Sequence, residues 1–157
     1  MFSVGDTVCY PMNGVGTVEA IEEKTVQGEA KLFYRLHFET GHLTVSIPVS
    51  NAASVGLRQV TDAQTAEAIL SFMQGGDCSE ESSNWNQRYR DNYEKLKTGD
   101  IRTTADVVKC LWQREKKKGL SAGERKMYLS ARQTLVAELS FSTGKSADEI
   151  LECFNAQ

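Results

Sequence analysis

The fold of the N-terminal part is decided by residues 33–48, FYRLHFETGHLTVSIP. Apolar and polar side chains alternate in both halves of this stretch, which is the period of a half-buried β-strand. The apolar positions are Tyr34, Leu36 and Phe38 in the first half, then Leu43, Val45 and Ile47 in the second. Thr40-Gly41 between the halves is typical of a turn. The stretch therefore predicts a β-hairpin.

The same pattern continues on both sides of this hairpin. Residues 6–60 are rich in Val, Thr, Phe, Tyr and Ile, and glycine-containing turns divide them at Asn13-Gly14 and Gln27-Gly28. Four strands, with a fifth over residues 58–60, predict a small β-barrel or a curled sheet.

From Asp62 onward the hydrophobic period becomes helical. The first helical stretch carries Ala66, Ile69, Leu70 and Met73 on one face, and we expect it to close the β-domain. Residues 74–84 are polar and contain two glycines, which is typical of a linker. The sequence thus divides into a β-domain (1–62), a closing helix with a linker (63–83), and a third part (84–157).

The third part predicts a bundle of helices. One helix is expected from about residue 84 to the residue before Gly99, and a second over residues 103–118. Two capping boxes, Ser121 with Glu124 and Ser146 with Glu149, predict the starts of two more helices. The predicted fold class is α+β, with a small β-barrel followed by an all-helical bundle.

Composition limits the class of protein. The chain has 157 residues, 40% of them hydrophobic and 25% charged, and a net charge of −3. It contains no apolar run of about 20 residues and no signal-peptide pattern, so we expect a cytoplasmic protein that does not contact a membrane. The four cysteines form no CxxC pair, and we expect free thiols rather than disulfides or a metal site.

The charges are unevenly distributed along the chain. Residues 61–82 contain five acidic residues and no basic one, whereas residues 83–157 contain ten acidic and fourteen basic residues. A basic helical part favours contact with nucleic acid or another polyanion. The alternative is that these charges form an ordinary solvated helix face.

Sequence signatures of enzymes are missing. The chain has no P-loop, no GxSxG and no HExxH motif, and Gly14-Val15-Gly16 lies between two expected strands rather than before a helix. We therefore expect no enzymatic activity and no cofactor, with an enzyme of unrecognised type as a remote alternative.

The most informative stretch is residues 84–100, NWNQRYRDNYEKLKTGD. Trp85 stands at the start of an expected helix, and Arg88 and Arg90 follow it closely. An indole beside cations combines a flat apolar wedge with groups that bind phosphate. The alternative is that Trp85 packs onto the helical bundle, as large aromatic side chains usually do.

Four blocks of the sequence resemble the bacterial CarD/CdnL transcription regulators, in the same order. They are FSVGDTVCYPMNGVGTVEAIE, HLTVSIPVSNAASVGLR, WNQRYRDNYEKLKTGD and LSAGERKMYLSARQTLVAEL. The similarity extends from Phe2 to about Leu139. It implies a Tudor-like, SH3-like β-domain that binds the β subunit of RNA polymerase, and a helical domain that faces promoter DNA.

The resemblance also implies roles for individual residues. Trp85 would wedge into the minor groove at the upstream edge of the −10 region, and Arg90 would contact a phosphate, with Arg88 in the same basic patch. The protein would then stabilise the promoter open complex. We expect it to act as a monomer associated with the nucleoid.

The implied polymerase-binding residues lie in the β-domain. They are Lys24, Leu43, Val45, Ser46 and Ile47. Ser46 stands where relatives are commonly basic, so a weaker or rearranged interface is expected, and the strand over residues 43–47 would pair edge to edge with polymerase. An adaptor that binds polymerase but has little activity on DNA is the closest alternative function.

Overall fold

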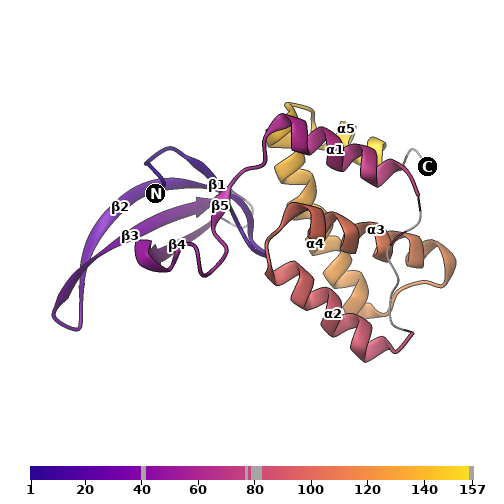
Figure 1. Cartoon of the computed structure of the whole chain (residues 1–157), viewed down its shortest axis with the longest axis horizontal. Coiled ribbons are helices and arrows are strands. Elements are labelled where there is room, and N and C mark those ends of the chain that lie inside the picture. The colour runs from indigo at the N-terminus through magenta and orange to yellow at the C-terminus, as the bar shows by residue number, and fades with distance from the viewer. Residues whose placement is uncertain (40–41, 77, 79–82, 156–157) are drawn as a thin grey trace.

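The computed structural model describes residues 1–39, 42–76, 78 and 83–155. Figure 1 shows a bent β-sheet and a group of helices, which lie end to end along the long axis of the molecule. The predicted α+β class, with the sheet first in the chain, is confirmed. Within the described part, no helix is both long enough and apolar enough to cross a membrane.

The β-domain contains one antiparallel sheet in the order β4-β3-β2-β1-β5. Its strands are β1 (Thr7–Tyr10), β2 (Gly14–Val26), β3 (Glu29–Phe38), β4 (Leu43–Pro48) and β5 (Arg58–Gln59), with a 3₁₀ helix, η2 (Val49–Asn51), after β4. All the strands expected from the sequence are present. The strands β4 and β5 form the two edges of the sheet.

Burial in the sheet follows the alternation seen in the sequence. Tyr34, Leu36 and Phe38 are at most 1% exposed and pack with Val8 and Ile47 in the core of the β-domain. The intervening residues of β3 point to the opposite, solvated face. The strand therefore has one register that keeps its apolar side chains inside.

Two of the three predicted turns lie within the described residues and are confirmed. Gln27 and Gly28 join β2 to β3, and both have positive φ angles, 52° and 81°. A two-residue connection of this kind matches the twist of the strands that it joins. Asn13 precedes β2, and Gly14 begins it with a φ of 86°. The turn predicted at Thr40-Gly41 lies outside the described residues.

The described residues of the helical domain form five helices. They are α1 (Ala63–Gln74), α2 (Trp85–Lys97), α3 (Ile101–Lys117), α4 (Ala122–Thr143) and α5 (Ala147–Asn155). All five are capped by side chains that accept a backbone N–H, and these caps are Asp62, Asn84, Asp100, Ser121 and Ser146. Such caps satisfy donors that the first helical turn leaves free.

The position of α1 differs from the prediction. Ala66, Ile69, Leu70 and Met73 do not close the β-domain, because they are buried in one core with residues of α3, α4 and α5. The periodicity located this apolar face correctly, but periodicity alone does not identify the surface that covers it. The helical domain therefore begins at α1. Trp112 is half-buried at the edge of this core.

We predict that a fragment of residues 1–62 folds without the helical domain. Its core has its own cluster of buried residues, separate from the helical core. Circular dichroism of the fragment should show a β-spectrum and a cooperative thermal transition. An unfolded fragment would contradict the division of the chain into two independent cores.

Candidate functional site

Trp85 is the first residue of α2 and lies at the surface. Asn84 caps the helix by accepting the backbone N–H of Gln87 at 3.2 Å. The indole is 45% exposed, which is unusual for so large an aromatic side chain. Trp85 is therefore not a core residue of the bundle.

The exposed indole is held in one orientation by two contacts. Its Nε1–H donates to the Oγ atom of Ser121 at 2.8 Å. Its ring stacks on Tyr89, with 6.0 Å between the ring centroids and 27° between the planes. A side chain fixed in this way loses less conformational entropy when it binds a partner.

The hydroxyl of Ser121 connects Trp85 to the start of α4. It accepts the backbone N–H of Glu124 at 3.2 Å and donates to the Oε1 atom of Glu124 at 3.2 Å. With the indole N–H this makes two accepted bonds and one donated bond, which is the full capacity of a serine hydroxyl. The sequence predicted the capping box, but it held no signal that the cap also binds Trp85.

Arg88 does not lie in the exposed basic patch expected from the sequence. It is 3% exposed, and its Nε and Nη2 atoms donate to the two carboxylate oxygens of Glu124 at 2.9 and 3.1 Å. Two residues along an α-helix correspond to a rotation of about 200°, so Arg88 and Arg90 point to opposite sides of α2. Arg88 therefore braces α2 against α4.

The Arg88–Glu124 pair also determines the charge of Glu124. Burial alone would raise the pKa of this carboxyl, but the hydrogen bonds from Arg88 and Ser121 outweigh burial and lower the pKa below its usual value. The pair therefore stabilises the folded state above the pKa of the unfolded chain, and this contribution is lost as the pH falls through the folded-state pKa.

Arg90 is exposed, and its Nη2 donates to the Oε1 atom of Gln87 at 3.2 Å. A second basic segment lies at the same end of the bundle. The exposed residues 116–118 end α3 only three residues before Ser121, whose hydroxyl binds the Trp85 indole. Exposed cations thus occur on the helix that carries Trp85 and just before the residue that binds its indole.

The β-domain residues predicted to bind polymerase differ in their exposure to solvent. Lys24 and Ser46 lie on the solvated face, where the Nζ atom of Lys24 donates to the Oγ atom of Ser46 at 3.2 Å. Val45 is half-buried and Ile47 is buried in the core, so these two side chains expose little surface to another protein. Leu43 is exposed at the start of β4.

The backbone of β4 offers a contact that its side chains do not. In the described sheet β4 pairs with β3 alone, which leaves its other edge without a neighbouring strand. An edge strand of this kind can add a strand from a partner protein.

The described residues contain no group of three or more His, Cys, Asp or Glu side chains placed to hold a metal ion. A small cavity between the two domains is lined in part by Cys9, Arg58 and Glu138. Burial, with a further contribution from the Glu138 carboxylate, raises the pKa of Cys9 to about 12. This thiol is therefore protonated at neutral pH and is a poor nucleophile.

We predict that Arg88→Ala destabilises the full chain by about 3–5 kcal/mol, because it leaves the Glu124 carboxylate buried without its bidentate partner. Arg90→Ala, which removes an exposed side chain from the same helix, should change stability by less than about 0.5 kcal/mol. Urea unfolding at pH 7 measures both changes. Equal stability of the two variants would show that the buried pair does not brace α2.

Comparison with known proteins assigns both halves of the chain to one family. Residues 2–61 match the family model described as the CarD-like/TRCF RID domain, and residues 68–155 match the CarD C-terminal domain. A Bacillus subtilis (strain 168) protein named "Putative transcription factor YdeB" is 39% identical over 150 residues, which cover 96% of this chain and 97% of that protein. The chain therefore belongs to the CarD/CdnL family.

Proposed function

We propose that this protein is a transcription regulator without enzymatic activity that binds RNA polymerase and stabilises the promoter open complex. The β-domain binds the β subunit, and the helical domain places Trp85 in the minor groove at the upstream edge of the −10 region. The protein acts as a monomer at promoters in the nucleoid. The observation that carries this proposal is the exposed indole, which Ser121 and Tyr89 hold in one orientation.

A fixed aromatic ring suits a wedge between base pairs. Inserting an apolar side chain costs about a few kcal/mol of unstacking at each base step. The cost is smaller where polymerase has already distorted the duplex, so Trp85 engages melting DNA better than intact DNA. A protein that binds the open complex more tightly than the closed complex lengthens the lifetime of the open complex.

The exposed cations of α2 and α3 suit phosphate rather than bases. Arg90 and residues 116–118 are solvent-exposed positive charges, which bind phosphate oxygens without reading the sequence. Contacts to phosphate position a protein on DNA without reading its sequence. Promoter choice then comes from polymerase and from the deformability of the DNA.

The β-domain supplies the tether. The free edge of β4 pairs with a strand of the polymerase β subunit, and Lys24 and Ser46 lie beside this edge on the solvated face. Tethering gives the helical domain a high effective concentration at the promoter, which lets a small DNA contact have a large effect.

We predict that the wild-type protein lengthens the lifetime of open complexes formed by its cognate polymerase and that Trp85→Ala abolishes this effect. The variant loses the wedge but keeps the tether. The lifetime is measured by following bubble collapse after a competitor is added.

Phe141→Ala is the matched control for this experiment, because it removes another exposed aromatic side chain near the far end of α4. It should act as the wild-type protein does. If the wild-type protein binds polymerase but Trp85→Ala is equally active, the adaptor function replaces the wedge. If the wild-type protein does not lengthen the lifetime, the proposed function is wrong.

We also predict that Arg90→Ala reduces the salt dependence of binding to fork-junction promoter DNA by the polymerase-bound protein. Loss of one phosphate contact should lower the slope of log affinity against log salt by about 0.9. Lys145→Ala is the control, since Lys145 pairs with Glu67 at 3.5 Å within the helical domain. A slope that Arg90→Ala leaves unchanged would rule out the phosphate contact.

A further inference from the structure

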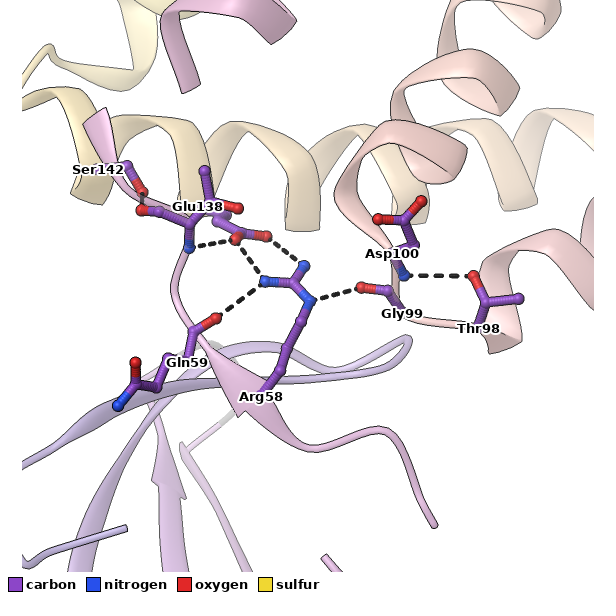
Figure 2. Close-up of polar contacts among 8 residues, drawn as sticks. Arg58, Gln59, Thr98, Gly99, Asp100, Glu138 and Ser142 are labelled. Atoms are coloured by element: carbon purple, nitrogen blue, oxygen red, sulfur yellow. Dashed lines mark hydrogen bonds and ion pairs between the residues drawn. The ribbon is translucent and has the colours of Figure 1, made fainter. Parts of the chain in front are cut away.

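The guanidinium group of Arg58 in β5 makes several of the hydrogen bonds that join the two domains. Figure 2 shows this side chain reaching away from the sheet to two separate segments of the helical domain. Its Nη1 and Nη2 atoms donate to the carboxylate of Glu138 in α4 at 2.7 and 2.8 Å. Its Nε donates to the carbonyl oxygen of Gly99, between α2 and α3, at 2.7 Å.

The geometry of this pair allows little rotation. Glu138 is only 4% exposed, and its Oε2 atom also accepts the backbone N–H of Thr61 at 2.9 Å. The carbonyl oxygen of Thr61 in turn accepts the Ser142 hydroxyl at 2.6 Å (Figure 2). Both oxygens of the carboxylate and three nitrogens of the guanidinium are thus engaged, so rotating one domain against the other breaks several bonds together.

An apolar contact fixes the same junction from another side. The ring of Pro11 lies between Gly56 of the β-domain and Gly99 of the helical domain. A Cβ atom at either glycine would lie 2.7 Å from the Cγ atom of Pro11, closer than real contacts of this kind. Both glycines also have positive φ angles, 83° and 72°, which side chains rarely adopt. The close approach of the domains therefore depends on these two residues.

The junction lies at one end of α2, and Trp85 lies at the other. Gly99 follows α2 closely, and the helix has 13 residues, which corresponds to about 20 Å. A rotation of about 10° at Gly99 would move Trp85 by about 3.5 Å, which is close to the 3.4 Å between successive base pairs. A small change of angle at the junction thus becomes a shift of one base step at the wedge.

We infer that Arg58 and Glu138 are positioning residues that fix the angle between the β-domain and α2, and so determine the base step that Trp85 meets. This inference rests on the proposed function, because it needs the β-domain to be held by polymerase and Trp85 to enter DNA. With the tether fixed, a stiff junction presents the indole at one step. A loose junction spreads it over neighbouring steps and lowers its effective concentration at each of them.

The first test measures the junction itself, without DNA or polymerase. Spin labels are placed at Glu29→Cys in the β-domain and Asn86→Cys in α2, both exposed positions, in a chain with Cys78→Ser and Cys153→Ser. The buried Cys9 and Cys110 stay in place. Pulsed electron paramagnetic resonance should give one narrow distribution of distances with the native junction.

Two junction variants change this pair in different ways. Arg58→Lys keeps the positive charge but loses the planar group that binds both carboxylate oxygens and Gly99, and Glu138→Gln keeps the shape but loses the charge. Both should broaden the distance distribution, while Lys145→Ala, which breaks an ion pair inside the helical domain, should not. Near-wild-type circular dichroism would show that each domain remains folded.

The second test locates the DNA distortion in open complexes at single-base resolution, using 2-aminopurine placed at successive positions around the upstream edge of the bubble. The wild-type protein should perturb one step, whereas the two junction variants should perturb several steps weakly and shorten the open-complex lifetime severalfold. A distance distribution unchanged in both variants would overturn the inference. A broadened distribution with the wild-type position and lifetime would overturn it too, while leaving the proposed function intact. If the wild-type protein itself has no effect on the lifetime, the proposed function fails and the inference fails with it.

Discussion

The ion pair between Arg58 and Glu138, with the contacts around it, joins two domains that have separate cores. An ion pair of this kind is a weak source of net stability, because removing two charges from water costs nearly as much as their attraction returns. Its main effect is to fix the relative orientation of the two groups that it joins. A planar guanidinium bound to both oxygens of a carboxylate has one favourable orientation, whereas an apolar contact of the same area tolerates sliding.

The helix α4 uses the same chemistry at both ends. Glu124 and Glu138 are the buried carboxylates of the described residues; Glu124 holds Arg88 of α2, and Glu138 holds Arg58 of the β-domain. The two positions are fourteen residues apart, about 21 Å along the helix and nearly on one face. The helix α4 therefore connects the two contacts: the β-domain is fixed near one of its ends, and the Trp85 end of α2 is fixed at the other (Figure 1).

How much of this could be predicted depends on the distance in sequence over which each interaction acts. The strand alternation around Tyr34 and the cap at Ser121 are local signals, and the structure confirms both. The position of Arg88 could also have been predicted, because a count of residues along α2 separates it from Arg90. The Arg58–Glu138 pair joins residues 80 apart in sequence, so it leaves no local pattern. The hydrogen bond from Trp85 to Ser121 joins residues 36 apart and leaves none either.

Rigidity explains how a small surface could act on a promoter. A free indole would lose side-chain entropy on insertion, about 0.5–1.5 kcal/mol for an ordered side chain, and a freely rotating domain would lose more. Because the hydroxyl of Ser121 already orients the indole, its side-chain entropy is lost before binding. The junction at Arg58 likewise reduces the rotational freedom that the helical domain would lose on binding. In the proposed function, contact with DNA then needs to offset mainly the unstacking of bases, which polymerase would already have begun. Under that proposal the residues of the junction contribute to the wedge as well as the exposed ring, because they determine where and in which orientation the ring meets DNA.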